Sequence, residues 1–164
     1  MGMGNRRRND RKRLSFKDCE IIWMNLRGLP TKYNENGGVR TFNVVLEDEE
    51  LIDKLIQDGW NVKARERQDG SLLHSLPVEA RYNNIPPQIW MITSNGRTLL
   101  DEYTVRQLDY ADIVKVDLIV NGRPWGDPGE EKIKAFCKSM YVTIEEDEFA
   151  KEYLYDDDDV PFDE

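Results

Sequence analysis

The chain has 164 residues, of which 39% are hydrophobic and 34% charged, and its formal net charge is −9. That length is enough for one domain with terminal extensions. There is no run of about 18 apolar residues and no apolar segment behind the basic N-terminus, so we expect neither a membrane-spanning helix nor a signal peptide.

The charge is distributed unevenly along the chain. Residues 1–13 contain six basic side chains and one acidic one, whereas residues 145–164 contain eleven acidic side chains and one lysine. The net negative charge is therefore mostly a property of the C-terminal end, and it does not argue against binding a polyanion through a local basic patch. We expect a flexible basic arm over 1–13, one folded domain over 14–146 and an acidic tail over 147–164.

The first half of the domain alternates between strand and helix patterns. Residues 16–26 and 40–46 are rich in β-forming side chains and flank a loop with Gly and Pro over 28–38. Residues 49–58 have apolar side chains at helical spacing, acids in the first turn and Gly59 behind them, which predicts a short helix. Residues 60–67 return to strand alternation.

The second half is predicted to be mostly strands. Residues 75–82 form one, and Asn95-Gly96 predicts a hairpin between 89–93 and 97–100. Thr104 and Gln107 fit a capping box for a short helix ending at Tyr110. Strands over 113–120 and 133–144 follow, with Asn121-Gly122 predicting a turn after the first of them. Closely spaced strands with few helices predict a mainly β, OB-fold-like Greek-key barrel, and a β-sandwich is the alternative.

Few residues suggest catalysis. His74 is the only histidine, and Cys19 and Cys137 lack metal-type spacing, so we expect reduced thiols in a reducing compartment and no zinc site. Phosphate-loop and nucleophile-elbow motifs are missing. We expect no enzyme, no cofactor and no metal. The acids at positions 101, 109, 112 and 117 leave a metal-dependent nuclease as an alternative.

Basic and aromatic side chains are interleaved in several strands, which is typical of proteins that bind single-stranded nucleic acid. Three cations alternate over 63–67, a Trp follows Arg123 in a segment with Gly and Pro, and Lys134 and Lys138 flank an aromatic residue. Trp23, Trp60 and Trp90 lie among apolar neighbours, so we expect them in the core. The alternative for the cations over 63–67 is a solvated strand face, for Trp125 a cap at the end of the barrel, and for Phe136 a core position. The candidate DNA-binding residues are Arg40, Phe42, Lys63, Arg65, Arg67, Arg81, Tyr82, Arg123, Trp125, Lys134, Phe136, Lys138 and Tyr141.

The C-terminal end has a distinct composition. Four consecutive aspartates cannot be buried together, and a small apolar anchor follows them directly. This combination indicates a peptide that another surface holds, although a solvated, inert terminus is the alternative. The candidate partner-binding residues are Asp156, Asp157, Asp158, Asp159, Val160, Pro161 and Phe162.

This tail resembles the acidic C-terminal tip of bacterial single-stranded-DNA-binding proteins, although here Asp163 and Glu164 follow the phenylalanine. The body resembles phage-encoded single-stranded-DNA-binding proteins instead, over residues 108–120, Trp125 and residues 134–146, and more weakly over 39–60. The resemblance implies an OB-type barrel that binds single strands without sequence preference in phage replication, recombination or repair. It implies no enzymatic activity and no metal, and it places the protein in the cytoplasm of an infected bacterial host.

The residues and the resemblance suggest one hypothesis for how the protein works. A basic, aromatic groove holds single-stranded DNA, and the tail competes for that groove and recruits replication or recombination proteins when DNA displaces it. Two other hypotheses remain: an acidic phage protein that mimics DNA and inhibits a host DNA-binding enzyme, and a nuclease or annealing factor. Monomer and homodimer are both compatible with the sequence.

Overall fold

The chain folds into a mainly β structure in the computed structural model, which describes residues 12–32, 35–83 and 85–146. The described part confirms the predicted fold class. In chain order its elements are β1 (Arg13–Cys19), β2 (Ile21–Asn25), β3 (Arg40–Leu46), α2 (Glu49–Asp58), β4 (Lys63–Glu66), β5 (Leu72–Ala80), β6 (Gln88–Thr93), β7 (Gly96–Leu100), the 3-10 helix η1 (Val105–Tyr110), β8 (Ile113–Trp125) and β9 (Lys132–Ile144).

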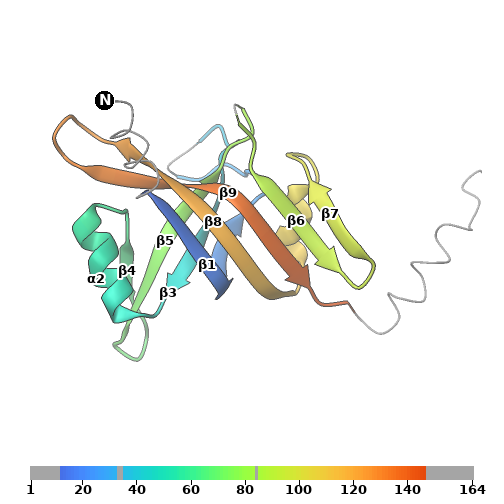
Figure 1. Ribbon diagram of the computed structural model, residues 1–164, viewed down its shortest axis with the longest axis horizontal. Coiled ribbons are helices and arrows are strands. Elements are labelled where there is room, and N and C mark those ends of the chain that lie inside the picture. The colour runs from blue at the N-terminus through green and yellow to red at the C-terminus, as the bar shows by residue number, and fades with distance from the viewer. Residues whose placement is uncertain (1–11, 33–34, 84, 147–164) are drawn as a thin grey trace, which may run out of the picture.

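The sheet curls into a small barrel (Figure 1). Neighbouring strands follow the order β1-β8-β9-β5-β3-β2. Only Glu20 separates β1 from β2 in the chain, so the two ends of this order meet. β5 and β9 pair in parallel, whereas the other neighbours in the ring are antiparallel. This connectivity agrees with the predicted Greek-key barrel and not with a sandwich of two sheets.

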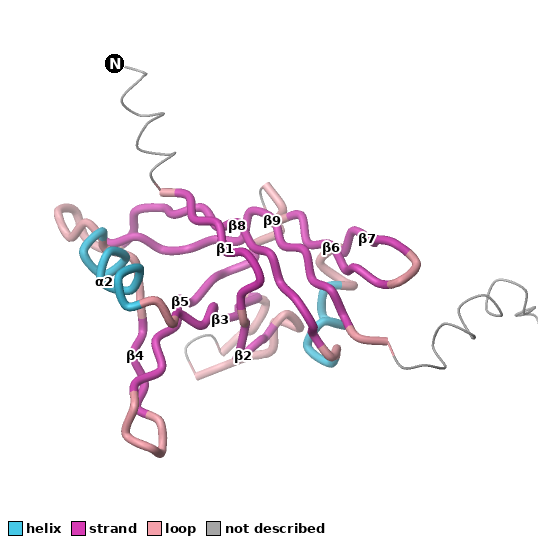
Figure 2. Tube along the Cα trace, turned by 60° about the horizontal axis from the view of Figure 1, so that its bottom comes forward, coloured by secondary structure: helices cyan, strands magenta, loops and turns pink. Residues whose placement is uncertain are grey.

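Two hairpins extend beyond the ring. β4 pairs with β5, and β6 pairs with both β7 and β9. Figure 2 shows the β4–β5 hairpin on one side of the barrel and the β6–β7 hairpin on the opposite side. The hairpin predicted from Asn95-Gly96 is present: Ser94 and Asn95 make the turn, and Gly96 follows at the start of β7, where it pairs with Thr93 and has a positive φ of 122°.

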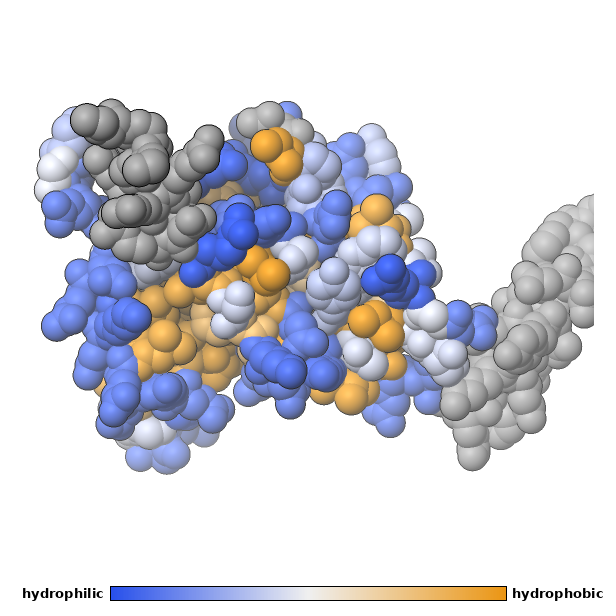
Figure 3. Space-filling view, in the orientation of Figure 1, coloured by the Kyte–Doolittle hydropathy of each residue, from blue (hydrophilic) through white to orange (hydrophobic). Residues whose placement is uncertain are grey.

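Alternate residues of each strand point into the barrel and form its hydrophobic core. Phe42, Val44, Leu76 and Val78 are 0% exposed, and alternate residues of β8 and β9 complete the same cluster. Partly buried apolar residues pack around this cluster, and an exposed apolar area lies beside α2, with hydrophilic residues at its edges (Figure 3). The outward positions of the same strands remain available for a ligand.

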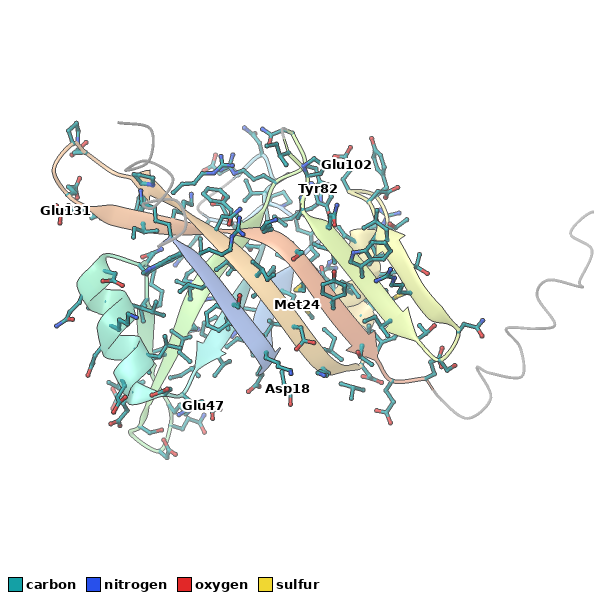
Figure 4. All side chains as sticks on the ribbon, viewed as in Figure 1. Asp18, Met24, Glu47, Tyr82, Glu102 and Glu131 are labelled. Carbon is teal, nitrogen blue, oxygen red and sulfur yellow. The ribbon has the colours of Figure 1, made fainter. Side chains whose placement is uncertain are left out.

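Helix α2 has the bounds that the sequence predicts. The Asp48 carboxylate accepts hydrogen bonds from the amides of Glu50 and Leu51, and Gly59 ends the helix in a left-handed conformation. A side chain at Gly59 would collide with the carbonyl oxygen of Glu131, which lies at the end of the β8–β9 hairpin (Figure 4). The glycine thus both ends the helix and lets the hairpin approach it.

The predicted turn at Asn121-Gly122 is wrong, because β8 continues without interruption to Trp125. A Cβ atom on Gly122 would lie 2.6 Å from the side chains of Trp60 and Ile133. The glycine is therefore explained by close packing under Trp60 and not by a turn. Asn121 pairs across the sheet with Phe136.

The predicted strand over 16–26 is divided at Glu20 into β1 and β2. The three tryptophans predicted for the core also have different environments: Trp60 is 5% exposed, Trp90 is half-buried, and Trp23 is 47% exposed. The core prediction is confirmed for Trp60 and wrong for Trp23. Among the described residues, no helix is long and apolar enough to span a membrane.

Candidate nucleic-acid interface

The ends of β8 and β9 bring cations and aromatic rings together on the outside of the barrel. In β8, Val116, Leu118 and Val120 face the core, so by alternation Arg123 and Trp125 face outward. Register places Arg123 opposite Lys134 and Trp125 opposite Lys132 in β9. Glu79 of β5 lies opposite Phe136. We call this surface the basic aromatic face; it consists of Glu79, Arg81, Arg123, Trp125, Lys132, Lys134 and Phe136.

Three cations surround the ring of Phe136. The guanidinium carbons of Arg123 and Arg81 lie 5.3 Å and 5.8 Å from its centroid, and Lys134 Nζ lies 6.0 Å from it. Lys134 Nζ is also 5.9 Å from the ring of Trp125, which is 43% exposed. One ammonium group therefore lies between two rings, and each ring lies within cation–π range of cations.

A carboxylate holds two of these cations in place. Glu79 Oε1 accepts a hydrogen bond from Lys134 Nζ at 2.6 Å, and its Oε2 accepts one from Arg81 Nε at 2.7 Å. Burial alone would raise the pKa of Glu79, but the hydrogen bonds and charges of Lys134 and Arg81 lower it on balance. Glu79 is thus ionised at neutral pH and fixes the positions of both cations.

Two hollows adjoin the basic aromatic face. One, of about 320 Å³, is lined by residues that include Arg81, Arg123, Phe136 and Lys138. The other, of about 620 Å³, is lined by Glu79 and Lys134 together with residues of β3 and of the segment between β2 and β3. The basic aromatic face is therefore a contoured surface, with room beside its rings.

Arg40 and Tyr82 lie beside this surface. The Arg40 guanidinium is 5.5 Å from the Tyr82 ring and donates a hydrogen bond to the backbone oxygen of Glu102 at 3.0 Å; Tyr82 and Glu102 lie close together in Figure 4. Burial raises the pKa of the Tyr82 hydroxyl. The Tyr82 hydroxyl and Arg40 Nε have no hydrogen-bond partner among the described residues. Arg81 lines the hollows on both sides of this strand end.

The remaining candidates lie elsewhere, and one was wrong. Phe42 is 0% exposed in the core, so it cannot stack on a ligand. Lys63, Arg65 and Arg67 lie on the β4–β5 hairpin, away from the basic aromatic face; Arg67 donates hydrogen bonds to Ser71 Oγ and to a backbone oxygen and so stabilises the turn. Tyr141 is half-buried further along β9, opposite Trp90.

Sequence reasoning missed two contributors to this surface. Lys132 Nζ lies 5.2 Å from the Trp125 ring and pairs with Glu130 at 2.7 Å; its alternation with Lys134 was the available signal. Glu79 was not selected because nothing local marks a carboxylate as the partner of two cations.

Three of the four aspartates that suggested a nuclease have structural partners. Asp109 accepts hydrogen bonds from the amides of Leu26 and Arg27, Asp101 from those of Tyr103 and Thr104, and Asp117 from that of Asp18. No group of three or more potential metal ligands occurs among the described residues. The predicted partner-binding residues, Asp156 to Phe162, lie outside the part of the chain that the structure describes.

Comparison with known proteins identifies the family of the chain. A family model described as a putative phage ssDNA-binding domain matches residues 3–163. Two solved structures have a similar fold. The C-terminal truncation of the single-stranded DNA-binding protein from bacteriophage Enc34 has a TM-score of 0.54 at 10% identity, covering 84% of this chain and 88% of that one. The full-length Enc34 protein has a TM-score of 0.53 at 9% identity, covering 87% and 90%. No curated protein matches the sequence. Because the family model spans nearly the whole chain, this protein belongs to the phage single-stranded-DNA-binding domain family.

Proposed function

We propose that the protein binds single-stranded DNA without sequence preference through the basic aromatic face. The observation that carries this proposal is the position of Lys134 between the rings of Trp125 and Phe136. A ring offers a base a stacking partner whatever its identity, and a cation beside the ring pairs with the phosphate that follows the base. The solved Enc34 proteins, which share the fold, are titled single-stranded DNA-binding proteins.

The charge of this face favours a polyanion although the chain as a whole is acidic. Arg81, Arg123, Lys132 and Lys134 face outward within one region, and Glu79 and Glu130 are paired with members of this group. Local cations attract phosphates over roughly a Debye length, about 8 Å at physiological salt, so distant acids affect binding little. The function follows from this face and not from net charge.

The acidic tail supplies the second part of the proposal. Its aspartates are complementary to the cations of the basic aromatic face, and tethering gives the tail an effective concentration up to the millimolar range. The tail competes with DNA for this face, and DNA binding frees it to recruit replication or recombination proteins in the infected host cell. Removing residues 155–164 is expected to tighten DNA binding at low salt; an unchanged affinity would contradict the competition.

The decisive experiment is a titration of labelled oligo-thymidine followed by fluorescence polarisation across a salt series, repeated with duplex DNA and with RNA. We expect tight, salt-dependent binding of the single strand and quenching of tryptophan fluorescence, with Trp125→Phe retaining affinity and Trp125→Ala losing it. A DNA mimic would bind no oligonucleotide. A nuclease would cleave the labelled strand when magnesium is added.

A further inference from the structure

We propose that Trp23 and Arg65 form a second base-stacking site on the β4 side of the barrel, so that a bound single strand runs from the basic aromatic face across β5 to this pair. The inference rests on the proposed function and extends its binding path. We call these two residues the Trp23–Arg65 pair. Its ligand is a nucleobase of single-stranded DNA, which stacks on the exposed indole ring while Arg65 contacts the adjoining phosphate.

The backbone turns Trp23 outward against the regular alternation of β2. Ile21 lies opposite Val44, which is fully buried, so a regular strand would also direct Trp23 into the core. Instead, the register with β3 shifts between Ile22 and Asn25, and Trp23 adopts a left-handed φ of 52°. Such shifts re-aim side chains, and a bulky residue in this conformation is strained. A strained backbone that exposes a tryptophan does not stabilise the core. The strain is explained if the exposed ring binds a ligand.

Arg65 reaches this ring from the far side of β5. Its guanidinium carbon lies 5.3 Å from the Trp23 ring centroid. The β4 strand is exposed along its whole length, so the pair is open to solvent at the hairpin. An exposed indole with a cation at its face repeats the arrangement of Trp125 with Lys132.

Strand register places both sites on the same face of the sheet. Arg65 lies opposite Leu73, and Phe136 lies opposite Glu79. Leu73 and Glu79 are six residues apart in β5 and thus point the same way, separated by about 20 Å at 3.3 Å per residue. About six nucleotides cover that distance at a stacked rise of about 3.4 Å, and fewer if the strand is extended. This span falls within the roughly 4–16 nucleotides that one OB barrel occupies.

A similar pair at the opposite hairpin provides a matched control. Arg97 lies 4.8 Å from the ring of Trp90 in the β6–β7 hairpin, and Figure 2 shows this hairpin on the other side of the barrel from β4. Trp90 is half-buried in a regular strand, without a left-handed φ. If only the loss of a cation–π contact mattered, Arg65→Ala and Arg97→Ala would change DNA affinity alike. If the DNA strand crosses β5, only Arg65→Ala changes it.

The test uses the full chain with two labelled probes, oligo-thymidines of four and of twelve nucleotides. The short probe occupies the basic aromatic face alone, and the long one reaches both sites. Trp23→Ala is expected to weaken binding of the long probe about tenfold and that of the short probe less than about twofold. Trp23→Phe should restore most of the affinity, because it keeps a ring. Arg65→Ala should weaken binding of the long probe several-fold, while Arg97→Ala should not.

The outcomes separate this inference from the function on which it rests. Unchanged affinity of Trp23→Ala and Arg65→Ala for the long probe would overturn the inference while leaving the proposed function in place. If Arg97→Ala weakens binding of the long probe and Arg65→Ala does not, the DNA strand runs along β9 instead, and the inference is equally overturned. Wild-type protein that binds neither probe would defeat both. Thermal melting of each variant checks the fold, and Arg65→Ala, at a fully surface-exposed strand, tests the path should Trp23→Ala fail to fold.

Discussion

The two faces of β9 show how one strand serves the barrel and its surface. Its inward residues Ala135, Cys137 and Met140 are 0–7% exposed and belong to the core, whereas the alternate residues Lys134 and Phe136 face outward among other cations. Phe42 and Phe136 illustrate the difference between an inward and an outward position. Both are phenylalanines in strands with basic neighbours, but Phe42 is enclosed by apolar side chains and Phe136 is half-buried beneath Arg81 and Arg123. An aromatic residue in a β protein can bind a base only when the pleat turns it outward.

Phe42→Ala should have the largest effect on stability and none on DNA recognition by the folded protein. Removing a fully buried phenylalanine is expected to lower the free energy of unfolding by about 3–5 kcal/mol, because a cavity remains in the core. Urea denaturation measures this loss, and polarisation measures affinity under conditions where the variant is folded. A large loss of DNA affinity in the folded variant, with little loss of stability, would contradict this assignment.

Phe136→Ala should show the opposite pattern. The ring is half-buried and contacts cations, so its loss should weaken oligo-thymidine binding by about 1–3 kcal/mol and destabilise the fold less than Phe42→Ala. Phe136→Tyr keeps a ring and serves as the control. The same polarisation and urea experiments apply; equal losses in both variants would place the ring in a structural role.

Arg123→Ala should reduce the dependence of DNA binding on salt. Arg123 has no carboxylate partner in any described ion pair, and it lies over Phe136, so it is available to a phosphate. Loss of one phosphate contact should reduce the slope of log K against log salt by about 0.7 for a single strand. Lys54→Ala on the exposed side of α2 is the matched control. Identical slopes for the two variants would remove Arg123 from the interface.

The buried thiol of β9 should make stability sensitive to alkaline pH, with a smaller effect. Burial raises the pKa of Cys137 to about 12 from the ordinary 9.0. Below pH 9 the thiol is protonated in both states; above it, the unfolded chain releases the proton while the folded chain retains it. Stability is therefore lost as pH rises from about 9 toward 12.

At pH 10 the contribution of Cys137 to this loss is about 1 kcal/mol. Urea denaturation at pH 8 and pH 10 should show a smaller decrease for Cys137→Ala than for the wild type. Cys19, whose pKa is also raised by burial, to about 11, contributes in the same direction in both proteins. An equal decrease in wild type and variant would mean that the thiol ionises freely in the fold.

Local patterns in the sequence were sufficient for most elements. The apolar spacing, the first-turn acids and Gly59 predicted the bounds of α2, and Asn95-Gly96 predicted the β6–β7 hairpin. Strand alternation identified Lys134 and Phe136 as surface candidates, whereas Arg123 and Trp125 were selected as an arginine and a tryptophan in a segment rich in Gly and Pro, which the structure places at the end of β8. These signals succeed because helix periodicity, capping and tight turns depend on residues only a few positions apart.

Only the tertiary structure decided which of the two faces of each strand points into the core, and which surface side chains from different strands come into contact. Arg40 and Phe42 share one side of β3, and only the curvature of the barrel determined that this side points inward. Gly122 fits a turn by composition, but Trp60, sixty-two positions earlier in the chain, packs against it. Trp23 faces outward because of a backbone irregularity within β2, and its partner Arg65 comes from another strand. Contacts between distant residues depend on how the whole sheet closes, and that closure is a collective property that no short stretch of sequence contains.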